Sequence, residues 1–165
     1  MDTLGAKIAL LGGVAIYYAL VVFNNVTDFN SNYQFVHHVL AMDTSFPGNH
    51  GMGRAITASW LQLLFYLVII AWEIMTTILL AWGAVRLFRA RRAAPSAIDL
   101  SKDVAVLALT LSLLMWLVAF LAVGGEWFLM WQSRQWNGQE EAFRMFAVVG
   151  IVLLFVTQPE RETQP

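Results

Sequence analysis

One carboxylate, Glu73, stands near the middle of the longest apolar run in the chain, which extends from about residue 55 to residue 85. A charged side chain at the centre of a bilayer costs about 2.5–3.5 kcal/mol on membrane-insertion scales. The nearest basic residue along the chain, Arg86, is 13 residues away, which is about 20 Å along an α-helix. We therefore expect Glu73 to be protonated or to be hydrogen-bonded inside a bundle of helices.

Further polar residues share one helix face with Glu73, because they recur at intervals of three, four and seven residues. They form a polar stripe through an otherwise apolar helix: Ser59, Gln62, Tyr66, Glu73, Thr76 and Thr77. Polar groups in lipid must be satisfied within the protein, so the stripe is expected to face other helices. Two interpretations stay open. The stripe holds the bundle together by hydrogen bonds, or it is a proton or cation relay or the floor of a small-molecule cavity.

All three histidines of the chain, His37, His38 and His50, precede this run, in a polar segment that also holds Asp28 and Asp43. Imidazole and carboxylate groups together can ligate zinc or copper. Adjacent side chains on a helix point about 100° apart, however, so His37 and His38 are not expected to share one ion easily. We predict no metal site and keep the three histidines as the candidate ligands.

No cofactor is predicted. The chain has no cysteine, which excludes iron–sulfur clusters, and no histidine lies within an apolar run, which excludes a transmembrane bis-histidine haem of cytochrome b type. No G-x-S-x-G or H-E-x-x-H pattern occurs. We therefore assign no catalytic residue, and the sequence argues against an enzyme more than for one.

The composition identifies lipid as the main solvent of the protein. Of the 165 residues, 59% are hydrophobic and 13% are charged, against about 45–50% and about 25% in soluble domains. Ten basic and eleven acidic residues give a net charge of −1, which argues against a nucleic-acid binder. Four apolar runs predict an all-α, four-transmembrane-helix bundle as a single membrane domain, with spans at about 6–23, 55–85, 104–123 and 143–156.

Basic residues predict the orientation, because they gather in cytoplasmic loops. The loop 24–54 holds Arg54 alone, and Arg134 and Arg144 lie in or just after the loop 124–142. The loop 86–103 holds five basic residues: Arg86, Arg89, Arg91, Arg92 and Lys102. We therefore expect this loop and both termini in the cytoplasm, the loops 24–54 and 124–142 on the outer side, and a frayed polar tail from residue 158 to residue 165.

The two outer loops are predicted to be ordered. Residues 30–43 place apolar side chains at helical spacing, which predicts a short amphipathic helix at the membrane interface. The second loop is rich in tryptophan, which is typical either of an aromatic belt at the lipid–water boundary or of a surface that docks a partner. The residues assigned to this outer surface are Asn24, Asn25, Asp28, Asp43, Glu126, Trp127, Trp131, Trp136 and Asn137.

Glu126 follows two glycines at the outer end of the third span. It is either an ordinary helix-end carboxylate or the residue that organises the outer loops through Arg54 or Arg134. Small residues predict two seams where helices pack closely. They are Gly5, Ala9 and Gly13 in the first span, and Ala105, Ala108 and Ser112 in the third.

Several strings in these loops resemble a known family. They are FNNVTD at 23–28, MDTSFP at 42–47, GGEWF at 124–128, WQS at 131–133 and WNG at 136–138. Together they resemble a prokaryotic family of predicted small integral membrane proteins of unknown function, which have about this length and four helices. The resemblance implies a location in the bacterial inner membrane. It implies no activity and no catalytic residue.

Three functions follow as hypotheses. The first is a non-catalytic accessory or structural subunit of a larger membrane complex, whose partners are the lipid bilayer and either other membrane subunits or further copies of the chain. The second is a small transporter or ligand-binding membrane protein that uses Glu73, Gln62 and Tyr66. The third is a membrane enzyme or redox subunit that acts on a quinone or a lipid at the outer interface, near Glu126, Trp131 and His37.

Overall fold

The computed structural model describes residues 3–160, and every regular element in that range is a helix. The all-α prediction is therefore confirmed for the described residues. Six segments are α-helical, two are short 3₁₀ turns, and one is a wider helix that continues α5 without a break. The elements are α1 (Thr3–Thr27), α2 (Phe29–Ala41), η1 (His50–Arg54), α3 (Ser59–Ala90), α4 (Pro95–Leu100), α5 (Asp103–Leu114), η2 (Met115–Trp127), η3 (Met130–Gln132) and α6 (Gln139–Thr157).

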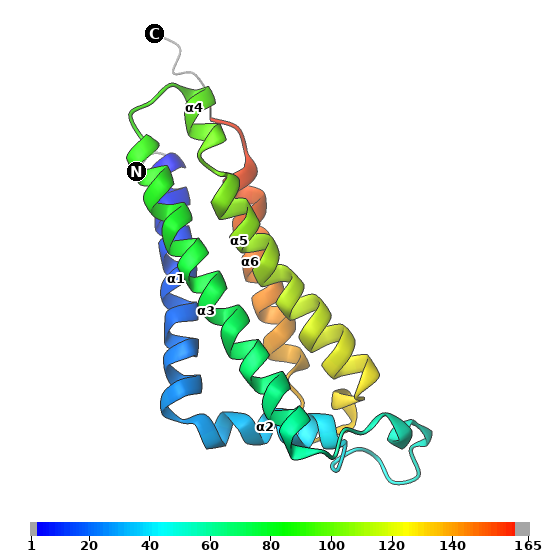
Figure 1. Ribbon diagram of the computed structural model, residues 1–165. Helices are drawn as coiled ribbons and strands as arrows, with labels where there is room; N and C mark the ends of the chain where they lie inside the picture. Colours follow the sequence, from blue (N-terminus) through cyan, green and yellow to red (C-terminus); the bar gives the residue numbers. More distant parts are fainter. Residues whose placement is uncertain (1–2, 161–165) are drawn as a thin grey trace.

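Four long rods, α1, α3, α5 with η2, and α6, run side by side (Figure 1). Along this bundle α1 packs on α3, α3 on α5, and α5 on α6, and α6 contacts α1 again, so the rods form a closed ring of neighbours. The short helix α2 runs crosswise at one end, and α4 lies at the other (Figure 1). We name these ends the α2 end and the α4 end.

Within residues 3–160, three helices are long and apolar enough to cross a membrane: 3–27, 59–90 and the continuous stretch 95–127. The sequence predicts four spans, so the structure supports one fewer by this measure. The difference lies in α6, whose 19 residues include Glu140, Glu141 and Arg144 in the first two turns. The apolar part of α6 is correspondingly short for a hydrocarbon core of about 30 Å.

The helix boundaries differ from the predicted ranges. The second long helix begins at Ser59 rather than at 55, because the chain before it is extended, as at Ala55 and Ala58. The first, third and fourth helices are longer than predicted, reaching Thr27, Trp127 and back to Gln139. The short helix predicted at 30–43 is α2, which ends where Met42 adopts a left-handed backbone conformation with φ of 54°.

The helix η2 is wider than an α-helix. At its end the N–H of Phe128 bonds to the carbonyl of Val123, five residues back. Such turns normally occur singly and are frequent near functional sites. Here the wide geometry extends over Met115–Trp127, beside the cavity described below.

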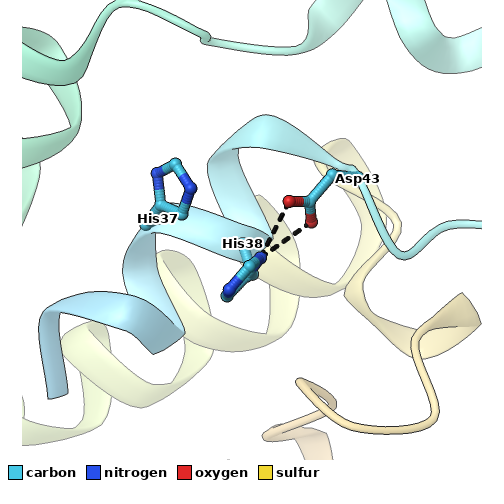
Figure 2. A group of neighbouring side chains, drawn as sticks. All are labelled: His37, His38 and Asp43. Atoms are coloured by element: carbon cyan, nitrogen blue, oxygen red, sulfur yellow. Dashed lines mark hydrogen bonds and ion pairs between the residues drawn. The ribbon is translucent and has the colours of Figure 1, made fainter. Parts of the chain in front are cut away.

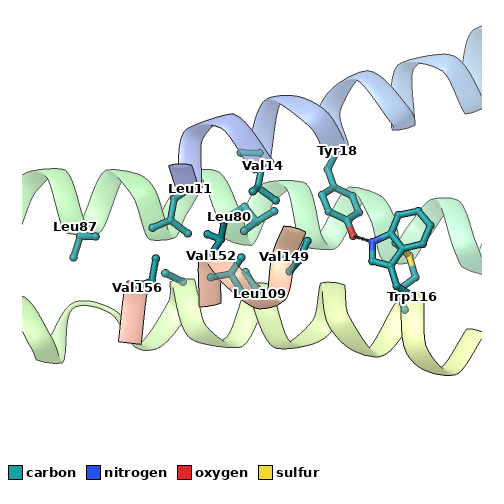
Figure 3. Packing of buried hydrophobic residues seen from close by; sticks show 14 of the residues in the cluster. Leu11, Val14, Tyr18, Leu80, Leu87, Leu109, Trp116, Val149, Val152 and Val156 are labelled. Atoms are coloured by element: carbon teal, nitrogen blue, oxygen red, sulfur yellow. Dashed lines mark hydrogen bonds between the residues drawn. The ribbon is translucent and has the colours of Figure 1, made fainter. Parts of the chain in front are cut away.

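The core between the four rods is apolar and interdigitated (Figure 3). Two helices approach each other closely at Gly83 of α3, where an added Cβ atom would lie 2.8 Å from the Cα of Ala105 on α5. Ala105, Ala108 and Ser112 are fully buried, as predicted for a seam. The seam predicted on α1 is wrong at Ala9 and Gly13, which are exposed, and Gly13 has no neighbouring atom within 4 Å of an added Cβ.

Candidate functional site

The polar stripe of α3 faces the interior of the bundle along most of its length. Gln62, Tyr66, Glu73 and Thr76 are buried, and Glu73 is only 2% exposed. Thr77 is half-buried and bonds the backbone carbonyl of Glu73 at 2.8 Å, one turn back. Ser59, at the first position of the helix, is exposed. The stripe thus places one carboxylate and its polar neighbours away from lipid.

The carboxylate of Glu73 is bound by α1. The Nδ2 amide of Asn25 donates to its Oε2 atom at 2.6 Å. The hydroxyl of Tyr66 donates to the backbone oxygen of Asn25 at 3.0 Å, with the side-chain Oδ1 at 3.3 Å. We name these three residues the Glu73 cluster. It joins the last turns of α1 to the middle of α3, so Asn25, assigned to the outer surface from the sequence, instead pairs with the stripe.

A second polar group joins α2 to α3 through the amide of Gln62. Its Nε2 atom donates a hydrogen bond to the carbonyl of Ile56 at 2.7 Å. Its Oε1 atom accepts hydrogen bonds from Nδ1 of His37 at 2.8 Å and from the Tyr33 hydroxyl at 3.5 Å. The ring of Tyr33 also lies 6.0 Å from that of Tyr66. The amide of Gln62 therefore positions His37, a contact that the sequence analysis did not anticipate.

Thr76 is the exception to this pairing. Its Oγ1 atom is buried and, among residues 3–160, has no hydrogen-bond partner. A hydroxyl left unpaired in an apolar setting costs free energy.

Three candidate metal ligands at the end of α2 lie closer together than helical spacing suggests: His37, His38 and Asp43 (Figure 2). The rings of His37 and His38 are 4.9 Å apart. Nδ1 of His38 bonds both oxygens of Asp43, at 2.8 and 3.0 Å. Potential ligand atoms of the three residues all lie within 4.8 Å of one another, whereas His50 stands in η1 outside this group.

The tryptophans of the second loop differ in their surroundings. Trp127 is exposed, and the guanidinium of Arg54 lies 5.2 Å from the centre of its ring. Trp131 is exposed and lies perpendicular to the ring of Phe46, with ring centres 5.8 Å apart. Trp136 is half-buried and stacks on His38 at 4.7 Å. Two of the three therefore present apolar surface outward, and the third is part of the packing at the α2 end.

The two loops at this end bond to each other. The Thr44 hydroxyl donates to that of Ser133 at 2.8 Å, and Oε1 of Gln132 accepts from the backbone N–H of Phe46 and from Asn49. The side-chain oxygen of Asn137 accepts from the N–H of Gln139, the first residue of α6. These contacts agree with the expectation of ordered loops.

The remaining residues assigned to the outer surface have local roles. The backbone oxygens of Asn24 and Asp28 accept from the side chain of Asn32, and Asp28 makes no side-chain cap of α2. Arg54 reaches the backbone carbonyl of Glu126 at 3.4 Å and not its carboxylate. In the described chain the exposed Glu126 carboxylate has no hydrogen bond or ion pair, so it does not organise the loops through Arg54 or Arg134 as one interpretation proposed.

A buried ionic cluster at the α4 end was missed by the sequence analysis. Lys7, 2% exposed, donates to the Gln158 carbonyl and to Oε1 of Glu160, both at 2.6 Å. Lys102, 4% exposed, bonds the same two groups at 2.7 and 2.8 Å and Asp99 at 2.7 Å. We name these residues the lysine cluster. The prediction of a frayed tail is therefore wrong for residues 158–160, while 161–165 lie outside the described residues.

The charge balance of this cluster acts on Glu160. Burial by itself would raise the pKa of its carboxyl group, but hydrogen bonds from Lys102 and Lys7 outweigh burial and hold that pKa below its ordinary value of 4.5. Glu160 therefore stays ionised between the two ammonium groups. The cluster ties α1, the α4–α5 turn and the end of α6 together.

A third polar group lies inside the bundle between α1 and α5. The indole N–H of Trp116 donates to the Tyr18 hydroxyl at 2.8 Å (Figure 3), and this hydroxyl shares a hydrogen bond with Ser112. The indole of Trp72 on α3 donates to the Leu111 carbonyl at 3.2 Å. All of these groups join different helices, which is the use expected of polar residues in a membrane bundle.

An apolar cavity of about 240 Å³ lies near the α2 end, between α2, α3 and η2. Its lining holds only apolar side chains and one glycine, and Phe65, Val68 and Val118 at its margin are 40–52% exposed. Other lining residues include Phe35, Val39, Trp72, Phe120, Val123 and Met130. Such a lining suits a hydrocarbon chain, whereas Glu73 is not among these residues.

Comparison with known proteins identifies one family. Residues 3–159, nearly the whole chain, match the family model described as "predicted small integral membrane protein (DUF2165)". No curated protein and no solved structure matched the chain. The match agrees with three helices apolar enough to span a membrane and with the buried polar groups between them. The chain therefore belongs to this family of small integral membrane proteins.

Proposed function

We propose that the protein crosses the bacterial inner membrane four times, with α6 as the fourth span. Support comes from the packing of α6, which contacts both α1 and α5 and buries Val149, Val152 and Val156 against them. Its charged first turns would lie at the membrane surface, where charge is tolerated. The five basic residues of 86–103 favour a cytoplasmic α4 end with both termini, and α2 would then lie at the outer interface.

The function that we propose is that of a non-catalytic accessory or structural subunit of a larger membrane complex. The observation that carries this proposal is the environment of Glu73. The one acidic residue in the middle of a span is 2% exposed, and its carboxylate accepts a hydrogen bond from Asn25. A group bound in this way supports helix packing rather than ion transfer.

The experiment uses the absence of cysteine from the chain. Single cysteines at the exposed positions Ile16 of α1 and Ile151 of α6 would be treated in native membranes with a short bifunctional thiol–amine crosslinker. A subunit should give one discrete adduct, of defined mass, from one of these faces. Native mass spectrometry should then recover the same assembly in a fixed ratio. A lone monomer in several mild detergents, without adducts from either face, would overturn the proposal.

The transporter hypothesis receives less support, because Glu73 is sealed and is not part of the apolar cavity. The hypothesis of a protein that acts on a quinone or lipid is favoured by that cavity, which lies next to the loops of the α2 end. Filling it with Ala119→Phe tests this second candidate. Loss of co-purified lipid or quinone from the variant, with unchanged helix content, supports it, and an unchanged lipid and quinone content refutes it.

A further inference from the structure

We propose that His37, His38 and Asp43 bind one divalent transition-metal ion of the zinc or copper class. The three residues lie together at the end of α2, where His38 bonds Asp43, and they offer ligand atoms within 4.8 Å of one another (Figure 2). Two imidazoles and a carboxylate are a ligand set that suits zinc or copper, and a solvent molecule can complete the coordination. This proposal is independent of the accessory role proposed above.

The hydrogen bonds around His37 fix which of its nitrogens can bind a metal. The Ile56 carbonyl can only accept, so the amide nitrogen of Gln62 must face it, and the Gln62 oxygen must face His37. That oxygen in turn can only accept, so Nδ1 of His37 carries the proton. Its Nε2 therefore keeps the lone pair, and the bond through Nδ1 is the arrangement that orients metal-binding histidines.

The pair of His38 and Asp43 supplies the other ligands. Met42 takes a left-handed conformation with φ of 54°, which turns the chain so that Asp43 returns to His38. Trp136 stacks on the His38 ring, with an interplanar angle of 15°, and holds its orientation. In the ion-free protein a proton lies between His38 and the carboxylate, at 2.8–3.0 Å. An ion bound to Nδ1 would displace that proton, which can move to Nε2 of the same ring.

The site is accessible and has room to adjust. The side chains of His38 and Asp43 are 26% and 43% exposed, so an ion can enter from the solvent at the α2 end. Tetrahedral metal bonds of about 2.0–2.2 Å place the ligand atoms about 3.3–3.6 Å apart. The His38 imidazole and the carboxylate must therefore separate slightly, and the widest spacing in the group, up to 4.8 Å, must shorten. Asp43 lies in the turn after α2, where such a shift disturbs no helix.

The test is zinc chloride titrated by calorimetry into the full chain, purified in detergent micelles and stripped with a chelator. We expect one equivalent of zinc to bind per chain, with a heat signal that saturates at that ratio. Asp43→Asn and His38→Gln should each weaken binding at least 10-fold. His50→Gln is the matched control, because it removes a histidine outside the group, and it should leave the affinity unchanged.

Cobalt absorption spectra provide a second readout, because they report nitrogen and oxygen ligation directly. Circular dichroism of each variant shows whether it is folded, and Asp43→Asn keeps the proposal testable if His37→Gln fails to fold. Absence of saturable binding would overturn the proposal. So would an equal loss of affinity in His50→Gln and His38→Gln, which would indicate dispersed surface binding, or full affinity in a folded His37→Gln variant.

Discussion

Removing the amide of Asn25 should loosen the bundle by a measurable amount. Asn25→Ala deletes the donor that lies 2.6 Å from Glu73 and one of the two oxygens near the Tyr66 hydroxyl, while the backbone oxygen of residue 25 remains. Leaving a buried acceptor unpaired costs about 1–3 kcal/mol. Hydrogen bonds between membrane helices measured by double-mutant cycles reach about 1.7 kcal/mol. We therefore expect a loss of about 1–3 kcal/mol in the free energy of unfolding, of which about 1 kcal/mol is coupling to Glu73.

The assay is unfolding by sodium dodecyl sulfate in mixed micelles, followed by far-ultraviolet circular dichroism. A cycle of Asn25→Ala, Glu73→Leu and the double variant isolates the coupling energy. Glu73→Gln keeps an oxygen that can accept from Asn25 and should cost less than about 1 kcal/mol. Asn24→Ala is the matched control, because that neighbouring side chain is exposed and only its backbone oxygen is used. Coupling near zero, or equal losses in Asn24→Ala and Asn25→Ala, would refute the reasoning.

Three further predictions concern packing, acid stability and the α2 end. Gly83→Ala should lower the free energy of unfolding by about 1–3 kcal/mol, because the added Cβ atom meets the backbone of Ala105. Gly13→Ala, at an open position, should be neutral or stabilising, and equal effects of the two variants in detergent unfolding would contradict this. Because the pKa of Glu160 is lowered in the folded protein, its carboxylate contributes fully to stability above pH 4.5, and this contribution is lost as the pH falls through the folded-state pKa. Hydrogen exchange at the α4 end should therefore rise in acid, and Glu160→Gln should lack this acid-dependent rise. Arg54→Ala should increase hydrogen exchange in the loop after η2, because Arg54 bonds the backbone carbonyls of Glu126 and Trp127, whereas Glu126→Gln should leave it unchanged. A larger effect of Glu126→Gln would contradict this by showing that the carboxylate orders the loop.

The sequence predicts those features of the fold that depend on local periodicity. Apolar runs predict the long helices, and spacing along one helix predicts that Gln62, Tyr66 and Glu73 share a buried face. The amphipathic pattern at 30–43 likewise predicts α2. In each case the information lies within a few turns of one helix.

The partners of these residues were not predictable in the same way. Asn25 is 48 residues from Glu73 and lies beyond the apolar run of its own helix, so no local pattern connects the two. The sequence places Lys102 among the basic residues that predict the orientation, because lysine near a helix end normally extends to water. It gives no separate signal for Lys7. Their acceptor, Glu160, lies in a segment whose polarity predicts fraying.

The shape of η2 and the position of Gly83 also depend on tertiary packing. Nothing in the residues 115–127 differs in periodicity from an ordinary apolar helix, and the wide geometry is visible only in hydrogen bonds such as that from Phe128 to Val123. Gly83 carries no motif of small residues along its helix. Its neighbour Ala105 lies on another helix, so the close contact cannot be predicted from the sequence of either helix alone.

Thiol accessibility at position 76 tests most directly whether the polar interior is sealed. Thr76→Cys places a small nucleophile one turn from Glu73 at a fully buried position, in a chain that has no other cysteine. Native membranes would be treated from each side with a charged methanethiosulfonate, with the exposed Thr57→Cys as the reactive control. If the polar interior is sealed, the cysteine at position 76 stays unmodified under conditions that modify the cysteine at position 57 completely. Rapid modification at 76 from either side would reveal an aqueous path to Glu73 and contradict the account.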